Sequence, residues 1–351
     1  MVRGLGTDER LLVLGLSHRT APVAQREKAR LAEPAARSLL GVLLGHPAVV
    51  ESAVLSTCNR TELLAIVADP AWGEALLSQA LVDHSRIGRD ELAEARYVHG
   101  DRVAARHLFR VAAGLDSMVL GESEVQGQVR AARELARAAG TLGLLLDRTF
   151  AHALRAGRRV RAQTLVAAGA VSVSSVAVDL ARVAIGDLRD RRALLVGAGR
   201  AAEAAARALL GQGLAEVVVA NRTPATAIRL AARFGGRAAG LDALADDMAA
   251  VDVVISSTDA GHTIVDATSL ARALGRERHR PLVLIDIAVP RDVDPRVGEL
   301  PGVRLYDIDD LRRVADANLD DRRREAVRAE AIVAAEVRRF AGERPRLRAA
   351  A

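Results

Sequence analysis

The chain has 351 residues, of which 50% are apolar and 27% charged, so it suits two soluble globular domains and is not a disordered protein. Its single cysteine excludes an internal disulfide, a cysteine zinc site and an iron–sulfur cluster held by this chain. Aromatic residues make up only 2%, which disfavours RNA-binding modules that stack bases on exposed rings. The net charge is +6, and Lys28 is the only lysine among 50 basic residues, which leaves 49 arginines. Genomic base composition explains most of this excess, although a positive balance also suits a polyanionic partner.

The N-terminus carries no recognisable targeting segment. Its apolar run at residues 11–16 is too short for the core of a secretory signal and follows the acidic Asp8 and Glu9. No stretch approaches the roughly 18 consecutive apolar residues of a membrane-spanning helix. We therefore expect a cytoplasmic protein that does not contact membranes.

Short apolar runs separated by polar turns mark the first hundred residues. The runs at residues 11–16, 49–56 and 63–68 predict buried strands, and a helix is expected near 34–44. The polar connection 57–62 joins the last two strands and contains the only cysteine. This order predicts a compact α+β domain with a functional loop.

The next segment has helical periodicity almost throughout. Residues 103–113, 124–139 and 142–162 carry apolar residues at spacings of three and four, which predicts three helices. Residues 114–123 interrupt them and contain two glycines, so we expect a bend there.

From residue 193 the pattern changes to strands alternating with helices. Strands are predicted at 193–196, 217–220, 251–256, 282–287 and 303–306. This alternation is typical of a doubly wound parallel sheet of the Rossmann type. After Asp307 the chain is expected to be helical to about Ala341, with an apolar face so thin that the helix must lean on another body or cross solvent.

A dinucleotide fingerprint of the form G-x-G-x-x-A follows the first of these strands and precedes a helix. In this motif the first glycine makes a tight turn, the second lets the backbone approach a pyrophosphate, and the small third residue packs helix against strand. Amides at the helix N-terminus then hold the phosphates. The residues predicted to bind the cofactor are Gly197, Ala198, Gly199, Arg200, Ala201 and Ala202.

The choice of cofactor is predicted at the end of the second strand. NAD sites usually carry an acidic residue about 20 residues after the glycines, whereas Asn221, Arg222 and Thr223 stand at that place here. Arg222 would attract a 2′-phosphate, and its two neighbours can donate hydrogen bonds to it. We therefore predict NADPH.

Cys58 lies in a polar loop two residues before Arg60. A lone cysteine is often only a small buried hydrophobe. An unperturbed thiol, with a pKa of about 8.5, is a few per cent thiolate at neutral pH, and a nearby guanidinium or strand-end dipole is expected to raise that fraction. Together with NADPH, an activated cysteine predicts covalent catalysis, in which a thioester is formed and then reduced to an aldehyde.

Five stretches resemble glutamyl-tRNA reductases, in order, between about residues 11 and 312. They are GLSHRTAPV (15–23), LSTCNRTE (55–62), HLFRVAAGLDSMVLGE (107–122), DIAVPRDVDP (286–295) and YDIDDL (306–311). The resemblance implies NADPH-dependent reduction of glutamyl-tRNA(Glu) to glutamate-1-semialdehyde through a cysteine thioester. That reaction is the first step of tetrapyrrole (porphyrin and haem) biosynthesis by the C5 pathway.

The resemblance also implies roles for individual residues. Cys58 corresponds to the nucleophile, and His107 to a histidine that orients substrate or moves a proton. Arg60 suits the glutamyl carboxylate because its planar fork donates two parallel hydrogen bonds, and Glu122 suits the substrate ammonium group. The implied substrate pocket consists of Thr57, Asn59, Arg60, Ser117, Glu122, Glu124 and Gln128.

Three features limit these expectations. Glu124 replaces a glutamine that is usual in the family, and its charge would repel a glutamyl carboxylate unless it is protonated or turned away. The eight histidines show no spacing typical of a metal site, so no metal is expected. The chain stops where the family continues into a helical dimerisation domain, so the family's homodimer is doubtful here.

The expected organisation has three parts. Residues 1–165 would form a catalytic domain that recognises glutamyl-tRNA, residues 166–308 an NADPH-binding Rossmann-type domain, and residues 309–351 a long helix with a shortened dimerisation region. The implied partners are glutamyl-tRNA(Glu) and glutamate-1-semialdehyde aminomutase.

Two other functions stay open at this point. An NADP-dependent dehydrogenase of a free small metabolite would not need Cys58. A non-catalytic paralogue that binds tRNA or a pathway partner would not oxidise NADPH.

Overall fold

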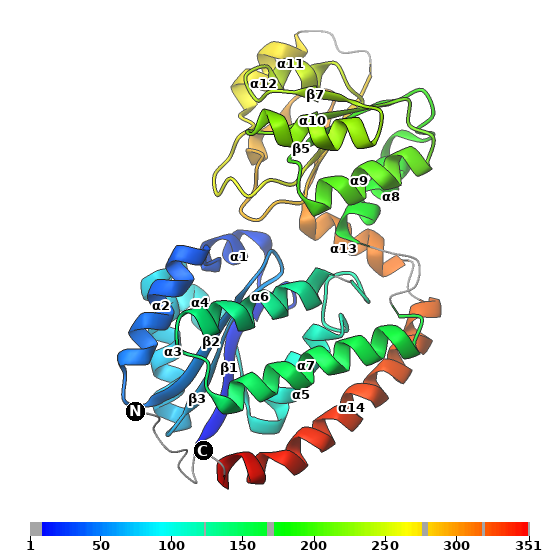
Figure 1. The fold of residues 1–351 in the computed structure, drawn as a ribbon. Coiled ribbons are helices and arrows are strands. Elements are labelled where there is room, and N and C mark those ends of the chain that lie inside the picture. Colours follow the sequence, from blue (N-terminus) through cyan, green and yellow to red (C-terminus); the bar gives the residue numbers. More distant parts are fainter. Residues whose placement is uncertain (1–8, 123, 167–171, 276–279, 318–319, 350–351) are drawn as a thin grey trace. The chain divides into compact units, whose positions relative to one another are not determined.

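The computed structural model describes residues 9–122, 124–166, 172–275, 280–317 and 320–349 (Figure 1). They form two compact units, residues 9–166 with 320–349 and residues 172–317. The region expected as a separate C-terminal part is divided between them. Its helix α13 (Ile308–Ala317) belongs to the second unit and α14 (Asp320–Ala349) to the first. The single long helix predicted after Asp307 is therefore described as two helices.

The first unit is built on a four-stranded antiparallel sheet with the strand order β2-β3-β1-β4. Three of these strands were predicted from the sequence, and the short β4 was missed. Strands β1 and β3 pair along their whole length, from Arg10 opposite Val67 to Ser17 opposite Arg60. The strand bounds are Arg10–Ser17 (β1), Val49–Ser56 (β2), Arg60–Val67 (β3) and Tyr97–Gly100 (β4).

Helices cover both faces of this sheet (Figure 1). Leu12 and Leu14 of β1 pack toward one helical layer, and Leu11 and Val13 toward the other. Burial on both faces explains why the strands are continuous apolar runs rather than alternating ones. The first layer holds α1 (Val23–Ala29), α2 (Glu33–Gly45), α3 (Pro70–His84) and α4 (Arg89–Ala95), and the second holds α5 (Asp101–Ala112), α6 (Glu124–Ala138), α7 (Leu144–Gln163) and α14.

Helix α14 rests on α5 and α7 of the first unit. Val333, Val337 and Phe340 are buried in the same core cluster as those helices. Glu336 is fully buried and accepts a hydrogen bond from His152 Nδ1 of α7 at 2.8 Å. This confirms the expectation that so polar a helix needs a second body to pack on.

The second unit contains a six-stranded parallel sheet in the order β10-β9-β8-β5-β6-β7, which confirms the doubly wound fold. Strand β6 lies on one side of β5 and β8 on the other, so the strand order reverses at β5, where such folds bind their ligands. The strand β7 was not predicted. The strand bounds are Arg192–Val196 (β5), Glu216–Ala220 (β6), Arg237–Ala239 (β7), Val253–Ser256 (β8), Leu282–Asp286 (β9) and Val303–Tyr306 (β10).

The helices of the second unit cover its sheet. Leu244 of α11 and Leu270 of α12 share a core cluster with the strands. Helices α8 and α9 pack on each other, and α8 also contacts β9. The helix bounds are Val173–Ile185 (α8), Arg200–Gly211 (α9), Pro224–Arg233 (α10), Leu244–Ala249 (α11) and Ala267–Leu274 (α12), with a 3₁₀ helix at Pro295–Glu299 (η1).

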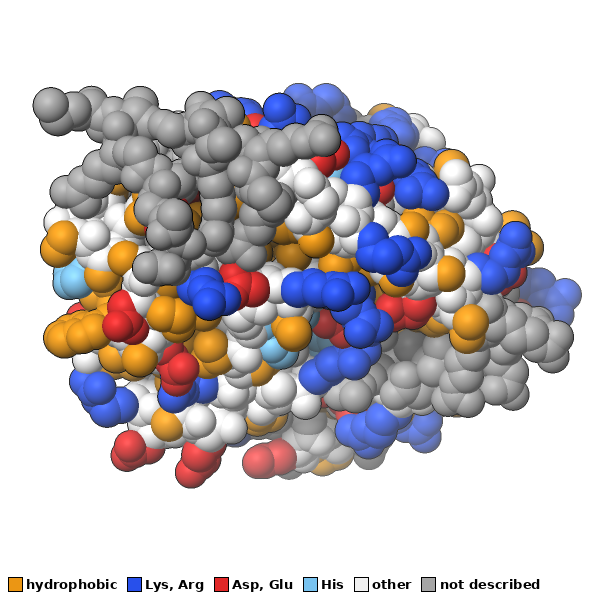
Figure 2. All heavy atoms as spheres, turned by 90° about the horizontal axis from the view of Figure 1, so that it is seen from below, with side chains coloured by type: hydrophobic (Ala, Val, Ile, Leu, Met, Phe, Trp, Pro, Cys, Tyr) orange, Lys and Arg blue, Asp and Glu red, His pale blue; other side chains and the backbone are white. Residues whose placement is uncertain are grey.

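The described surface is rich in arginine, but its charges are mixed. Figure 2 shows arginine side chains crossing one face with acidic and apolar side chains between and beside them. Many are paired, as Arg133 and Arg137 are with Asp147. Within the described ranges, every helix is too short or too polar to cross a bilayer.

Candidate active site

Cys58 lies in the tight turn between β2 and β3 and is partly exposed. The Thr57 amide donates to the Arg60 carbonyl at 2.8 Å, which closes the hairpin. The Thr57 hydroxyl oxygen accepts from the amides of Asn59 at 3.1 Å and Arg60 at 3.2 Å. Thr57 therefore shapes the loop that presents the cysteine.

The segment after β1 supports this turn from the side. Arg26 of α1 is 2% exposed, and its Nη1 donates to the Cys58 carbonyl at 2.9 Å and to Asn59 Oδ1 at 3.3 Å. The His18 amide donates to the Asn59 carbonyl at 2.9 Å. The stretch at residues 15–23 therefore belongs with the cysteine loop because it holds that loop in place.

The environment of the Cys58 thiol opposes ionisation. Burial and, after it, the charge of Glu122 raise its pKa to about 12, and the Arg26 guanidinium counteracts them only in part. Arg26 thus acts in the direction predicted for a nearby guanidinium, but burial and Glu122 outweigh it. Without substrate, the sulfur is protonated at neutral pH.

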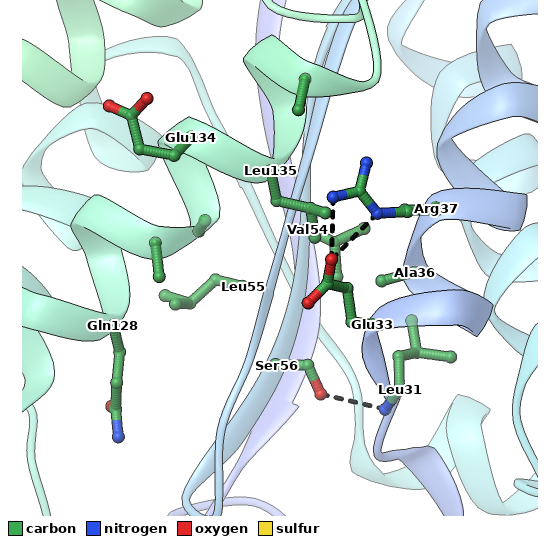
Figure 3. Close-up of a pocket in the computed structure, with 13 residues that line it drawn as sticks. Leu31, Glu33, Ala36, Arg37, Val54, Leu55, Ser56, Gln128, Glu134 and Leu135 are labelled. Atoms are coloured by element: carbon green, nitrogen blue, oxygen red, sulfur yellow. Dashed lines mark hydrogen bonds and ion pairs between the residues drawn. The ribbon is translucent and has the colours of Figure 1, made fainter.

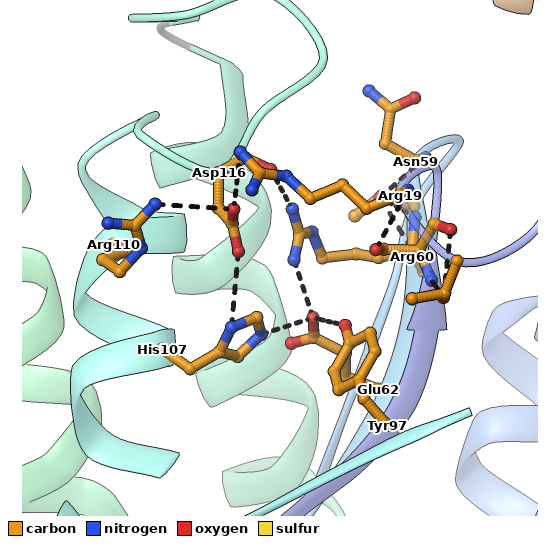
Figure 4. Close-up of polar contacts among 11 residues, drawn as sticks. Arg19, Asn59, Arg60, Glu62, Tyr97, His107, Arg110 and Asp116 are labelled. Carbon is orange, nitrogen blue, oxygen red and sulfur yellow. Dashed lines mark hydrogen bonds and ion pairs between the residues drawn. The ribbon is translucent and has the colours of Figure 1, made fainter. Parts of the chain in front are cut away.

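A buried ion cluster stands beside the turn (Figure 4). Arg60 is 2% exposed, and its Nη1 lies 2.7 Å from Glu62 Oε1 while its Nη2 donates to the Asp116 carbonyl. Tyr97 also donates to Glu62. Because the Arg60 guanidinium already has two protein partners, the predicted contact with a substrate carboxylate falls to its remaining N–H donors.

His107 lies between two carboxylates of this cluster. Its Nε2 is 2.8 Å from Glu62 Oε1 and its Nδ1 is 3.3 Å from Asp116 Oδ2. Burial alone lowers the pKa of His107, but the two carboxylates outweigh burial and raise it to about 9. The ring is therefore a cation with both nitrogens engaged, an arrangement that favours an orienting role over proton transfer.

Residues 114–122 form the predicted bend between helices. They include Asp116 of the ion cluster and the predicted site residues Ser117 and Glu122. Gly114 and Gly121 adopt φ values of +73° and +84°, which favour glycine. The Ser117 Oγ is buried and has no hydrogen-bond partner among the described residues. An unpartnered buried hydroxyl of this kind suits contact with a bound ligand or water.

Glu122 is a buried carboxyl group at the end of this bend. Burial and, after it, the charge of Glu124 raise its pKa to about 7, although Arg60 acts in the opposite direction. Both acids act electrostatically on Cys58, so they lie near the thiol. The predicted effect of Glu124 was repulsion of a substrate carboxylate. In the structure its charge also acts against ionisation of Glu122.

The fingerprint loop in the second unit has the features that a dinucleotide needs. Gly197 adopts a φ of +105°, and a Cβ there would lie 2.9 Å from the Ser257 carbonyl. Gly199 is the N-cap of α9, and its missing side chain would point into open space. Ala202 is buried against the sheet. The loop and the α9 N-terminus thus leave room and unpaired amides for a pyrophosphate.

Residues 221–223 follow β6, next to the end of β5. Val196 of β5 pairs with Ala220, so the exposed Arg222 lies near the fingerprint. The Asn221 side-chain amide donates to the Thr223 carbonyl at 3.2 Å and so orders this loop. Arg222 in this position, with no acid among residues 221–223, fits the 2′-phosphate of NADPH.

Comparison with known proteins identifies the family. Residues 14–164 match the profile described as glutamyl-tRNAGlu reductase, N-terminal domain, and residues 179–314 match shikimate/quinate 5-dehydrogenase. The glutamyl-tRNA reductases of Syntrophotalea carbinolica and Rubrobacter xylanophilus are 44% and 46% identical over 94% of this chain, which covers 74% and 76% of their lengths. The solved glutamyl-tRNA reductase of Methanopyrus kandleri is 36% identical over 96% of this chain and 81% of that chain, with a TM-score of 0.52. The chain belongs to the glutamyl-tRNA reductase family.

Membership in the glutamyl-tRNA reductase family confirms the resemblance found in the sequence. It also confirms the predicted class of enzyme, an NADP-dependent oxidoreductase, and does not favour the two alternative functions. The roles of individual residues stay predictions.

Several residues of this reductase site were not predicted. Arg26, Glu62, Tyr97 and Asp116 all contact the predicted residues, although only two of them had a signal in the sequence. Glu62 interrupts an apolar strand two residues after Arg60, and Asp116 lies between the glycines of the bend.

Gln128 is placed differently from the rest of the predicted pocket. It lies on α6 and lines a groove beside β2 together with Ser56 (Figure 3). The cofactor residues lie in the second unit, which is described by itself. Among the described residues, no group of His, Cys, Asp and Glu side chains is arranged to hold a metal ion.

Proposed function

We propose that this reductase converts glutamyl-tRNA(Glu), NADPH and a proton into glutamate-1-semialdehyde, free tRNA and NADP⁺, the first step of tetrapyrrole biosynthesis by the C5 pathway. The observation that carries the proposal is the position of Cys58. The only cysteine stands at the tip of a braced hairpin, where the buried carboxyl group of Glu122 acts electrostatically on its thiol. A nucleophile in such a place suits acyl transfer.

In the first step the Cys58 sulfur bonds to the ester carbonyl carbon of the glutamyl group. The bond from that carbon to the ribose oxygen breaks, and the tRNA leaves with its hydroxyl group restored by the thiol proton. The high pKa of the thiol must fall for this attack to proceed. We infer that the substrate ammonium group pairs with Glu122, which cancels the nearest charge that opposes the thiolate.

In the second step the thioester is reduced. NADPH supplies a hydride when it is bound. Cys58 then leaves the reduced carbon as a thiolate, the aldehyde is released, and the thiol recovers its proton. Residues 197–202 would hold the pyrophosphate and residues 221–223 the 2′-phosphate. The cation of His107 and its carboxylates would keep Arg60 and the neighbouring bend in position around the glutamyl group.

A single-turnover experiment tests this function. Glutamyl-tRNA without NADPH should leave a glutamyl mass on Cys58, and addition of NADPH should release semialdehyde. Cys58→Ser should bind charged tRNA but give neither product. If Cys58→Ser still turns over NADPH, or if the wild type never acylates, the proposal is wrong.

We also propose the partners and setting of the enzyme. Its product is a reactive amino aldehyde, so direct transfer to glutamate-1-semialdehyde aminomutase would protect it. Co-sedimentation of the two proteins, and faster transfer when both are present, would support such transfer. The tRNA substrate favours the cytoplasm, and light scattering at micromolar concentration measures whether the chain forms a homodimer.

A further inference from the structure

A groove runs along the outer edge of β2 between α2 and α6 (Figure 3). Val54 and Leu55 of β2 line it, and small or aliphatic side chains of the two helices form its walls, among them Ala36, Ala132 and Leu135. Its volume is about 480 Å³. Small-molecule sites usually enclose about 300–1,000 Å³, so the groove suits one small organic group.

One end of the groove approaches the nucleophile. Ser56 and Gln128 lie toward one end, and Glu134 toward the other (Figure 3). Ser56 is two residues before Cys58, so at roughly 3.3 Å per residue the two lie within about 7 Å along the chain. Val54, four residues before Cys58, lies within about 13 Å of it by the same measure, so a group against Val54 is within reach of one nucleoside from the sulfur.

The backbone of β2 offers hydrogen bonds to the groove. Thr57 and Arg60 form a hydrogen-bonded pair, so the alternate residues Ser52 and Val54 direct their amide and carbonyl groups away from β3. Ser52 fits this pattern because its amide donates to the Thr141 carbonyl at 2.9 Å and its carbonyl accepts from the Thr141 hydroxyl at 2.8 Å. β2 is an outer strand, so the Val54 donor and acceptor point toward the groove.

The rim of the groove offers no net positive charge. Arg37 donates twice to Glu33, at 3.0 and 2.8 Å, so this pair is neutral. Glu134 is paired with Arg137. A phosphate would find no unpaired cation among these groups, whereas an uncharged planar ring would meet aliphatic walls and one backbone donor and acceptor.

We propose that this groove binds the adenine of the 3′-terminal adenosine of glutamyl-tRNA, with the adenine N1 and 6-amino group against the backbone of Val54. The inference rests on the proposed function. The glutamyl ester is attached to the ribose of that adenosine, so the adenine must lie within one nucleoside of the attacked carbon. Adenine presents an acceptor at N1 and a donor at its amino group, which match an outward amide and carbonyl.

A second cleft in this unit has the wrong chemistry for a neutral base. It has a volume of about 380 Å³, and its lining combines four charged side chains, Arg19, Arg106, Arg110 and Asp116, with the rings of Tyr97, His99 and His107. Charged walls of this kind suit an ionic group. The β2 groove is therefore the better site for the adenine.

The test compares glutamyl-tRNAs charged by a ribozyme and ending in adenosine, purine riboside or guanosine. Purine riboside lacks the 6-amino donor, and guanosine carries a donor at N1 and an acceptor at position 6. We expect kcat/KM to fall about 10- to 100-fold for both, because hydrogen-bonding groups of the Val54 backbone are left unpaired. Equal kcat/KM for all three substrates would overturn the inference. In that case, reduction of the adenosine-ended substrate would still support the proposed function. If the enzyme did not reduce even this substrate, the result would count against the proposed function.

A variant of the groove links this preference to the site. Ala131 is an exposed alanine of α6 that lines the groove, so Ala131→Leu should fill it and reduce the preference for adenosine to within about threefold. Ala93→Leu on α4 is a matched control and should retain the full preference. The rate at which iodoacetamide alkylates Cys58 should be equal in both variants, which shows that the hairpin is intact. Full preference retained in Ala131→Leu would refute this assignment.

Discussion

His107 should make the first unit lose stability as the pH rises toward 9. Its two ring nitrogens face Glu62 and Asp116, so the folded state holds it as a cation. Substitution of His107 by glutamine removes the titrating group but leaves a side-chain amide that can donate to one carboxylate. The variant therefore separates the charge of the ring from the space that it fills.

The magnitude follows from the two pKa values. The folded value is about 9 and the ordinary value 6.5, a difference of 2.5 units (9 − 6.5), which corresponds to about 3 kcal/mol. Below pH 6.5 the ring is protonated in both states and the whole stabilisation is present. As the pH rises, the unfolded ring loses its proton first, so the stabilisation decreases and is lost once the pH passes 9.

Urea denaturation at pH 6.0 and pH 9.5 measures this loss. The free energy of unfolding of the wild type should fall by about 3 kcal/mol more than that of His107→Gln. Trp72, the only tryptophan, lies on α3 and helps to assign the transition to the first unit. The ionisation of Cys58 in the unfolded chain affects both proteins equally and cancels.

His99 provides the control. Its ring lies 5.0 Å from that of His107, and burial, followed by the His107 charge, lowers its pKa. His99→Gln should therefore keep the loss at high pH. The same pH dependence in wild type and His107→Gln would mean that His107 is neutral in the folded protein and would refute the reasoning.

Three further predictions concern other parts of the molecule. Glu122→Gln removes a charge that raises the pKa of Cys58, so alkylation by iodoacetamide at pH 8 should be about tenfold faster, and an unchanged rate would contradict the coupling. Glu51 accepts from two amides in the first turn of α7, at 3.0 and 2.6 Å, and Glu51→Ala should lower the free energy of unfolding by about 1–3 kcal/mol in urea denaturation. Arg222→Glu should raise the KM for NADPH at least about tenfold relative to that for NADH in steady-state assays, because it replaces attraction of the 2′-phosphate by repulsion, and a variant that still prefers NADPH would argue against this site.

The sequence predicted the long strands because burial dictates their composition. Leu11 to Leu14 are all buried, two toward each helical layer, so an unbroken apolar run was the correct signal. Strand β4 has only four residues, including Tyr97 and His99, and none of them is fully buried. Its pairing with β1 is a tertiary contact that no local pattern reveals.

The electrostatics around Cys58 could not be predicted from the sequence. Arg60 stands two residues from Cys58, which suggested a cation beside the thiol. Arg60, however, is the first residue of strand β3, whereas Cys58 lies in the turn before it. Residues two apart in a strand share a face, so the Arg60 side chain points to the same side as that of Glu62, into the ion cluster. The guanidinium that braces the cysteine turn comes instead from Arg26, on a helix that is distant in sequence.

The ion cluster beside the cysteine turn contains buried charges of both signs. Arg60 and His107 carry two positive charges, and Glu62 and Asp116 carry two negative charges because His107 and Arg60 overcome the effect of burial and hold both carboxyl pKa values well below the ordinary range. The charges of these four side chains cancel, which makes their burial tolerable, and the more exposed Arg19 and Arg110 also pair with Asp116. Glu122, with its pKa near 7, is an adjacent group whose negative charge a bound ammonium group can compensate. Activation of Cys58 is for this reason expected to accompany substrate binding. In the enzyme without substrate the thiol stays protonated, which protects it from reaction with other electrophiles.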